Sequence, residues 1–371
     1  MNKDLKDKTL DELENIVAGM GQKKYLAEYI FSFIQTKGIR EISEITTLSK
    51  AFRKDLAQQG YYISQIHIID RLADPDGTIK YLFELGDGSR VETVLLVDTP
   101  REINLDKQSH HVSAGSNISR GKGRKTLCVS TQVGCAVGCT FCATARVKLR
   151  RNLTAGEIVE QVYTVQKENG AVSNVVYMGM GEPLLNYNNV VRSVRILNHP
   201  SGRNIGIRHL TISTCGIAPA IKKLAGEDIH PRLAVSLNAT TDTLRTRLMP
   251  INAKYPLAEL LSAVKAYQQK VKQRVTFEYV MIKGLNDSVR CAEMLVKLLS
   301  NIWCNVNLIE YNPHRHCEFE ASGRASIERF VRVLQRAGIE TTVRFKRGQS
   351  INAACGQLGA GWVDTRHKGS K

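Results

Sequence analysis

The stretch Cys135-Ala-Val-Gly-Cys139-Thr-Phe-Cys142 places three thiols on one short segment. Three thiolates at this spacing can bind one soft metal centre, but they are one ligand short of a closed tetrahedral zinc site. Four-iron clusters usually take four cysteines, so three predict a cubane whose fourth iron stays open to another ligand. We therefore expect Cys135, Cys139 and Cys142 to be metal ligands, with the open iron at the centre of the chemistry.

Strand and helix patterns alternate from just before this triad to near the end of the chain. The predicted strands are Thr126–Gln132, Asn174–Gly181, Arg208–Thr214, Arg232–Asn238, Val275–Ile282, Cys304–Asn312 and Glu340–Lys346. The predicted helices are Thr154–Asn169, Asn188–Asn198, Ile217–Gly226, one within Pro256–Lys272, Ser288–Asn301 and Ser326–Gly338. Six βα units and a terminal strand predict an α/β fold in which a parallel sheet curls into a partial (β/α)6 barrel. Active-site groups are then expected on the loops after the strand ends.

The N-terminal part predicts a small accessory domain of helices followed by a β-unit. Amphipathic helical patterns fill residues 9–60, and Tyr61–Asp70 and Tyr81–Val97 read as strands with Gly and Asp turn signals between them. The stretch Thr99–Lys125 is rich in Ser, Gly and basic residues and predicts a flexible basic linker or insertion. The predicted divisions are an accessory domain over 1–97, the linker over 98–125, the barrel over 126–359 and a tail over 360–371.

The composition points to a polyanionic partner. Lys and Arg outnumber Asp and Glu by 52 to 35 in 371 residues, which gives a formal charge of +17, so nucleic acid is the expected partner and a merely basic protein the alternative. The start has no apolar leader, and no run approaches the roughly 18 apolar residues that span a bilayer. The nine cysteines do not resemble a secreted disulfide framework. We expect a cytoplasmic protein without membrane contact.

The triad, with Phe141 before its last cysteine, matches the CxxxCxφC signature of the radical SAM superfamily, where φ is aromatic. This resemblance implies a radical SAM barrel in which each thiolate binds one iron of one 4Fe-4S cluster and S-adenosylmethionine (SAM) binds the fourth. It implies that an electron from an external donor, such as flavodoxin or ferredoxin, splits SAM into a 5′-deoxyadenosyl radical. The alternative is a set of packed or zinc-binding cysteines, but no fourth ligand lies at zinc-motif spacing.

Met178-Gly-Met-Gly-Glu182-Pro183 ends the second predicted strand and looks like the superfamily's GGEP-type element. Glycines at a strand end let backbone approach a ligand, and a carboxylate can accept the methionine ammonium, so Gly181 and Glu182 are candidate SAM-binding residues. The alternative is a Gly-Pro turn with a solvated Glu. Rim groups after other strands could bind the rest of SAM, or could be helix caps and turn formers. These further candidates are Ser213, Ser236, Leu237, Asn238 and Asn312.

Several longer stretches look like the RlmN/Cfr family of RNA adenine methyltransferases, and most like its RlmN branch. They are Cys128-Val-Ser-Thr-Gln-Val-Gly-Cys135, Met178–Asn186, Leu248-Met-Pro-Ile-Asn-Ala-Lys-Tyr255, Glu278-Tyr-Val-Met281 and Ala354-Cys-Gly-Gln-Leu358. The resemblance implies methylation of C2 of an adenosine in 23S rRNA at the peptidyl transferase centre, and allows the adenosine beside a tRNA anticodon as a second substrate. It makes residues 1–97 an expected RNA-binding domain. Separately, and without a sequence signal for oligomeric state, we expect a monomer.

The same resemblance assigns three catalytic residues. Cys355 takes a methyl group from one SAM, and the radical from a second SAM abstracts hydrogen from that methyl group so that it can add to adenine. Glu92 then accepts a proton, and Cys128 attacks Cys355 to release the RNA with a transient disulfide. Two SAM molecules are thus used per turnover. From the residues alone, Cys355 could instead be a buried inert thiol and Glu92 an ion-paired strand residue.

The chain departs from the family pattern at three places. Thr99–Lys125 is an insertion after the strand that carries Glu92, Asn238 stands where many members have His, and Asn352 stands where many have Asp. Two alternative functions also remain open from the sequence: Cfr-like methylation of C8 of the same adenosine, and RNA binding by an iron–sulfur protein without catalysis.

For the remaining candidate residues, the sequence gives less specific predictions. Basic residues beside the triad and in the linker could contact RNA phosphate or could be solvated: Arg146, Lys148, Arg150, Arg151, Arg120, Lys122, Arg124 and Lys125. We expect Cys215, Cys291 and Cys304 to be packing residues. For His314, His316 and Cys317, RNA contact is preferred over metal binding.

Overall fold

The computed structural model describes residues 3–97, 123–314, 317–344 and 346–362. Much of the predicted linker, residues 98–122, lies outside them, as do Arg120, Lys122 and His316. In the described part of the chain, no helix is both long enough and apolar enough to span a membrane.

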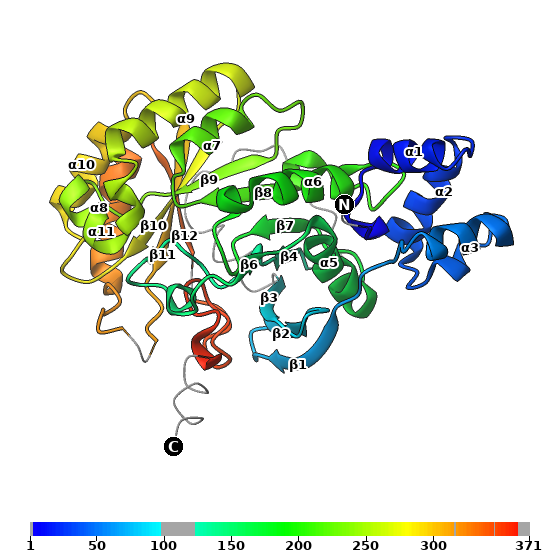
Figure 1. Cartoon of the computed structure of the whole chain (residues 1–371). Coiled ribbons are helices and arrows are strands. Elements are labelled where there is room, and N and C mark those ends of the chain that lie inside the picture. Colours follow the sequence, from blue (N-terminus) through cyan, green and yellow to red (C-terminus); the bar gives the residue numbers. More distant parts are fainter. Residues whose placement is uncertain (1–2, 98–122, 315–316, 345, 363–371) are drawn as a thin grey trace.

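One curved sheet of ten strands organises the molecule (Figure 1). Its order is β1-β2-β3-β4-β7-β8-β9-β10-β11-β12, and the neighbours from β4 onward pair in parallel. These strands are β4 (Lys125–Cys128), β7 (Asn174–Tyr177), β8 (Leu210–Thr214), β9 (Arg232–Ser236), β10 (Val275–Met281), β11 (Cys304–Glu310) and β12 (Glu340–Arg344). The predicted partial barrel is confirmed, with several strands ending earlier than expected.

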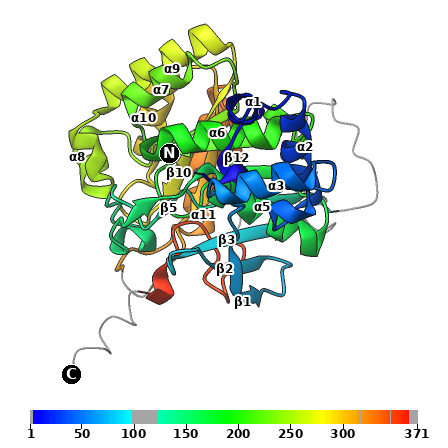
Figure 2. The ribbon, with the colours of Figure 1, turned by 45° about the vertical axis from the view of Figure 1, so that its right-hand side comes forward.

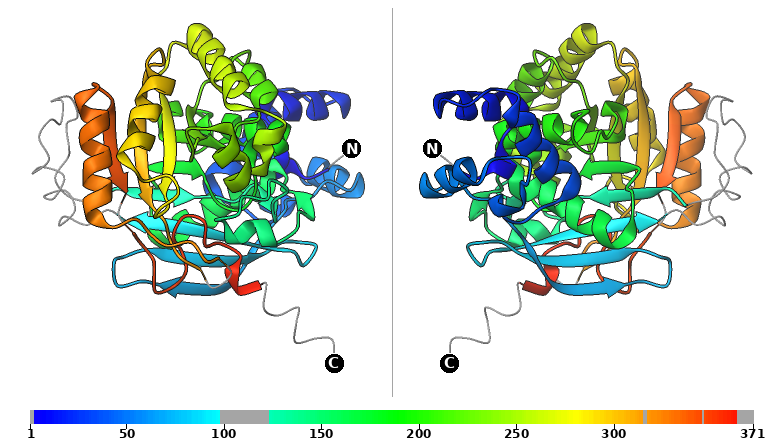
Figure 3. Two further views of the ribbon diagram at one scale, coloured as in Figure 1. Left: turned by 90° about the vertical axis from the view of Figure 1, so that its left-hand side faces the viewer. Right: turned by 90° about the vertical axis from the view of Figure 1, so that its right-hand side faces the viewer.

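The helices between these strands lie on the outside of the curved sheet (Figure 3). They are α5 (Ala155–Asn169), α6 (Tyr187–Asn198), α7 (Ala218–Leu224), α9 (Leu257–Val271), α10 (Val289–Leu299) and α11 (Arg324–Arg336), together with the unpredicted α8 (Asp242–Leu248). The start of α5 shows how local sequence sets these bounds: Thr154 and Glu157 form a reciprocal capping box there. Gly170, with φ of +74°, ends the helix.

The N-terminal region has two parts. Helices α1 (Leu10–Gly19), α2 (Leu26–Ser32) and α3 (Lys50–Gln58) form a unit beside α5 and α6 (Figure 2). Two contacts tie this region to α5: Lys6 Nζ donates to the half-buried Glu160 at 2.6 Å, and the Tyr163 hydroxyl donates to the buried Gln35, also at 2.6 Å.

The other part is the strand meander β1 (His67–Ala73), β2 (Ile79–Glu84) and β3 (Arg90–Val97). All its pairings are antiparallel, and β3 pairs with the first barrel strand through Val94 opposite Cys128. The predicted β-unit therefore extends the barrel sheet directly. The domain boundary at residue 97 remains a prediction, and β4 begins at Lys125, the last residue of the predicted linker.

Candidate active site

The cysteine triad lies on a loop that connects two short strands after β4. The short ribbon β5 (Gln132–Val133) and β6 (Arg151–Asn152) closes the loop at its base, and the Cys135 amide donates to Val147 at 3.0 Å. Gly134 has φ of +82°, and a Cβ there would lie 2.4 Å from the Lys148 carbonyl oxygen, so only glycine fits. The loop thus holds its thiols after the first barrel strand, where the sequence predicted them.

The three thiols lie close enough to influence one another's ionisation, and all three residues are partly buried. Burial raises the pKa of all three thiols, and that of Cys135 to about 12, because desolvation disfavours the thiolate; the neighbouring thiols add to the rise for Cys135 and Cys139. Among the described residues, no three His, Cys, Asp or Glu side chains converge on a single metal ion. In a cubane each cysteine binds a different iron, so three thiols around one space fit a 4Fe-4S cluster.

Gly181 and Glu182 follow β7 and lie against the loop's base. A Cβ on Gly181, whose φ is +101°, would lie 2.6 Å from Gln132 Cβ, so the backbone passes closely there. The Glu182 carboxylate is buried and accepts backbone N–H donors from Cys215 at 2.7 Å and Leu184 at 3.0 Å. Burial raises the pKa of Glu182 against these donors. A carboxylate has further lone pairs, so this one can still accept an ammonium.

The rim after β8 and β9 is built around Arg245, a residue that the sequence analysis missed. This arginine of α8 is fully buried, and its guanidinium donates to the carbonyls of Leu237, Ser236 and Cys215 at 2.7–3.1 Å. The sequence offers Arg245 and Arg247 two residues apart, with no signal for which one turns inward. The Leu237 side chain is fully buried, which leaves only its backbone for SAM, whereas Ser213 and Ser236 are half-buried.

The two asparagines proposed to bind SAM differ in whether their side-chain amide is available to a ligand. Asn238 has a left-handed backbone, with φ of +59°. Its side-chain Oδ1 accepts from the Val280 amide at 2.8 Å, and its Nδ2 contacts Met249 Sδ at 3.2 Å, so its amide is engaged within the protein. Asn312 Nδ2 donates to the Cys355 carbonyl at 3.2 Å, while its buried Oδ1 has no hydrogen-bond partner among the residues that the structure describes. Asn312 can therefore still accept a ligand donor.

Cys128 and Cys355 line the same cavity, which has a volume of about 370 Å³ and opens beside the triad. Cys128 ends β4, Cys355 is an exposed residue of the C-terminal segment, and Cys142 and Asn312 share the wall. The pKa of each of the two thiols is raised by the surrounding protein, because desolvation disfavours the thiolate. All nine cysteines are free thiols in the structure, so the expected disulfide is not supported by it.

The C-terminal segment, residues 346–359, is held on two sides. Its Gly356 carbonyl accepts from the Ala143 amide at 2.7 Å, next to the triad. On the other side, the turn between β1 and β2 receives it: Gly348 N donates to Asp76 at 2.8 Å and Ser350 Oγ to Asp74 at 2.6 Å. Figure 3 shows this red segment beside the cyan strands. The accessory strands thus help to place Cys355.

Glu92 lies on β3 behind this segment rather than on the cavity wall. It is 5% exposed, and its carboxylate pairs with Lys80 Nζ at 3.3 Å and accepts from the Gly359 amide at 2.8 Å. The ion-paired state that the sequence left open is therefore present, with the carboxylate two residues along the strand from Val94, which does line the cavity. Its role as a base remains a proposal.

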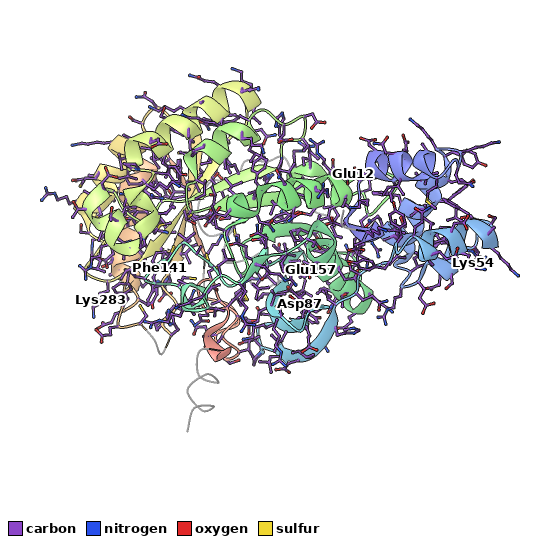
Figure 4. The ribbon with its side chains drawn as sticks, in the orientation of Figure 1. Glu12, Lys54, Asp87, Phe141, Glu157 and Lys283 are labelled. Carbon is purple, nitrogen blue, oxygen red and sulfur yellow. The ribbon has the colours of Figure 1, made fainter. Side chains whose placement is uncertain are left out.

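The basic residues beside the triad fall into two groups. Arg151 forms ion pairs with Asp87 at 2.7 Å and Glu157 at 2.8 Å, which joins the β2–β3 turn to the start of α5. Figure 4 labels these two acidic residues, Asp87 and Glu157. Lys148 and Arg150 are exposed. Two linker residues also have protein partners, since Arg124 donates to Asn174 and Lys125 to the Asn169 carbonyl.

The remaining cysteines occupy ordinary packing positions. Cys215 is buried, and Cys291 and Cys304 are half-buried against the core. Cys317 Sγ lies 3.5 Å from the Thr140 carbonyl. The loop that carries Cys317 therefore lies beside the triad loop, and its expected contact with RNA remains a prediction.

Two family profiles match this chain. Residues 129–299 match the Radical SAM superfamily, and residues 3–61 match the N-terminal domain of ribosomal RNA large subunit methyltransferases. The chain is 44% identical over 355 residues to the dual-specificity RNA methyltransferase RlmN of Geotalea uraniireducens, which covers 96% of both chains. It is 43% identical over 361 residues to a probable RlmN of Dictyoglomus thermophilum, with 96% and 97% covered.

A solved structure is similar over nearly the whole fold. It is a radical SAM methyltransferase from Sphaerobacter thermophilus, with a TM-score of 0.84 and 42% sequence identity, and the match covers 97% of this chain and 100% of that one.

Proposed function

This chain belongs to the RlmN family of radical SAM RNA methyltransferases, and we propose that it methylates C2 of an adenosine in 23S rRNA at the peptidyl transferase centre. The relatives are named as dual-specificity enzymes, and we extend the proposal to the adenosine beside a tRNA anticodon. The observation that carries the proposal is the shared cavity of Cys128 and Cys355 beside the triad cysteine Cys142. Neither rival, C8 methylation or cluster-dependent RNA binding without catalysis, is favoured, since the relatives match over nearly their whole length under the RlmN name.

The reaction needs more than an ordinary methyl transfer, because C2 of adenine is not a nucleophile. The family implies a 4Fe-4S cluster and SAM, which together supply a carbon radical when bound. Cys135, Cys139 and Cys142 would hold the cluster. The SAM-binding residues that we propose are Gly181, Glu182, Ser213, Ser236, Leu237, Asn238 and Asn312, with Leu237 contributing its backbone.

Cys355 is our proposed methyl acceptor. Its neighbours Ala353, Ala354 and Gly356 are small, and its residue is exposed to the cavity, so a methyl donor and an adenine can both approach it. One turnover then consumes two SAM molecules, one as methyl source and one as radical source. The electron comes from an external donor such as flavodoxin or ferredoxin.

Cys128 and Glu92 are proposed to release the RNA. Cys128 lines the same cavity as Cys355, and we propose that its sulfur attacks Cys355 to form a transient disulfide. Glu92 would accept a proton, and for this it must exchange its contacts with Lys80 and Gly359 for one with the substrate. We also propose that the protein acts as a cytoplasmic monomer.

The function is tested by mass spectrometry of RNA. Nucleosides from 23S rRNA and from tRNA are compared between cells with the gene and cells without it. We expect 2-methyladenosine in both RNAs only when the gene is present. An 8-methyladenosine product would favour the C8 alternative instead. Unmethylated RNA from cells that express the folded, cluster-loaded protein would remove the methyltransferase assignment.

The two-cysteine chemistry is tested by a matched pair of variants. Cys128→Ala keeps the methyl acceptor but lacks the releasing thiol, so we expect a covalent protein–RNA adduct that survives denaturing gel electrophoresis. Cys355→Ala lacks the attachment point and should give free RNA. If both variants leave free RNA, Cys128 does not act in the way proposed.

A further inference from the structure

Three polar residues form a cluster on neighbouring barrel strands, in which Glu278 and Asn307 are buried and Arg344 is half-buried. Glu278 on β10 lies opposite Asn307 on β11, and Arg344 ends β12 opposite Ile309. Glu278 is 3% exposed, and its Oε1 accepts from Asn307 Nδ2 at 3.0 Å and from Arg344 Nη2 at 3.2 Å. A buried carboxylate that receives both donors holds the guanidinium in one place, because breaking the pair would leave its charge uncompensated.

Arg344 extends from this cluster into the cavity that Cys128 and Cys355 line. Its Nη1 lies 3.8 Å from the sulfur of Met178, and the Met178 backbone in turn contacts the Cys128 thiol. The Arg344 guanidinium therefore lines the same cavity as the Cys128 and Cys355 thiols. Arg344 is also the strongest influence that opposes the burial-driven rise in the pKa of Cys355, and it acts in the same direction on the pKa of Cys128.

The other charges near these thiols are already engaged. Lys346 pairs with Glu310 at 2.7 Å on the same wall, Arg347 donates to the Val97 carbonyl at 3.3 Å, and the Lys80–Glu92 pair lies behind the segment. The neighbouring thiol Cys142 and the carboxylate Glu278 act against ionisation of Cys355. Among the described residues that line the cavity, Arg344 is the cation that acts on both thiols, and its pairing with Glu278 fixes it there.

We infer that Arg344, positioned by Glu278, stabilises the thiolates of Cys355 and Cys128 in turn. The inference rests on the proposed function and adds a residue to it. In the first step the Cys355 thiol gives its proton to solvent, and its sulfur forms a bond to the methyl carbon as the sulfonium–methyl bond breaks. Cys355 then becomes a neutral thioether, which leaves the guanidinium free to face Cys128.

The second step uses the same charge. Cys128 loses its proton, and its thiolate forms the S–S bond while the bond from the Cys355 sulfur to the methylene carbon breaks. The electron pair of that broken bond stays with the carbon, which takes up a proton and becomes the methyl group on the RNA. This exchange is balanced within itself, because the two sulfurs are oxidised to a disulfide while the methylene carbon is reduced to a methyl group.

The test measures thiol reactivity and does not depend on RNA methylation. Anaerobic, cluster-loaded enzyme with unmethylated Cys355 is alkylated by iodoacetamide at a series of pH values, and peptide mass spectrometry follows each cysteine. In Arg344→Met, we expect the apparent pKa of Cys355 alkylation to rise by about 1, which means about tenfold slower alkylation at a fixed pH below it. Arg344→Lys keeps the charge and should lie between this variant and the wild type.

Controls separate charge from structure. Cys291 on α10 should keep its wild-type alkylation profile in every variant, and Arg274→Met, at the far end of β10, should leave Cys355 unchanged. Arg344→Met leaves the buried Glu278 carboxylate without its cation, which could by itself disturb the cavity. We therefore also compare Glu278→Gln with Glu278→Gln/Arg344→Met, since both of these variants lack the carboxylate. The double variant should alkylate Cys355 more slowly than the single.

Methyl transfer from SAM to Cys355, seen as an intact-mass increase, distinguishes failure of the inference from failure of the function. No transfer in the wild type removes the proposed function and leaves the alkylation comparison valid. The role of Arg344 would be overturned, and the proposed function kept, by the following result. Methyl transfer is normal, and Cys355 alkylation has the same pH profile in wild type and Arg344→Met and also in Glu278→Gln and the double variant.

Discussion

Arg245 shows how a single buried side chain shapes the rim of the site. Its guanidinium donates to three backbone carbonyls after β8 and β9 and to Asn252 Oδ1 at 3.0 Å. Burial lowers the pKa of Arg245, and the hydrogen bonds compensate for the cost of burying the charge. The C-terminal ends of β8 and β9, which carry Ser213 and Ser236, are therefore held by a residue that need not touch SAM itself.

Replacing this side chain should cost stability. Arg245→Met leaves several buried carbonyls without donors, and we expect the free energy of unfolding to fall by about 3 kcal/mol in urea denaturation. Arg247→Met, on the exposed side of the same helix, should change it by less than about 0.5 kcal/mol. Equal losses in the two variants would show that the hydrogen bonds of Arg245 contribute little.

At the scale of elements, Arg151 joins a turn of the accessory strands to the barrel. It bridges Asp87 of the β2–β3 turn and Glu157 in the first turn of α5. Because β3 carries Glu92 and pairs with β4, this bridge helps to hold the proposed base in register with the barrel. The Arg151 guanidinium keeps the pKa of Asp87 below its ordinary value.

Arg151→Met should lower the free energy of unfolding by about 1 kcal/mol at pH 7, as expected for a partly exposed bidentate pair. A carboxylate with a depressed folded-state pKa stabilises fully above its unfolded pKa, near 4, and loses this effect as the pH falls through the folded value. The difference between wild type and variant in urea unfolding should therefore be equal at pH 7 and pH 5 and shrink below about pH 4. A decline between pH 7 and pH 6 would assign the effect to another group.

For the whole molecule, the charge of +17 predicts RNA binding that weakens steeply with salt, because phosphate contacts release counterions. Lys148 and Arg150 are exposed beside the triad loop, while Arg151 is held by carboxylates. We expect Lys148→Met/Arg150→Met to reduce the slope of log Kd against log salt by about 2 in filter binding.

Arg151→Met is the matched control for this measurement. It removes one positive charge from the same stretch, but this charge is already paired with carboxylates. Its slope should equal that of the wild type. The contrary result would be a salt slope that falls in Arg151→Met by half as much as it falls in Lys148→Met/Arg150→Met. In that case net charge, rather than the exposed pair, determines the contact with RNA.

Local sequence was enough for the order of elements and for part of the site. The strand and helix periodicities predicted the barrel, because each repeats over a few neighbouring residues. The triad was found because its three ligands share one loop, and the resemblance to the RlmN/Cfr family identified Cys128 and Cys355. Helix α8 was missed because it is short and most of its residues are polar.

The sequence by itself determined the alternation of strands and helices, the cluster motif and the candidate thiols. Only the tertiary structure decided which distant residues meet: Cys128 with Cys355 in one cavity, Arg344 with Glu278, Lys80 with Glu92, and the β-unit with the barrel sheet. The physical reason is that periodicity records which face of an element is buried. The partner on another strand depends on sheet order and register, which are set when the whole sheet closes.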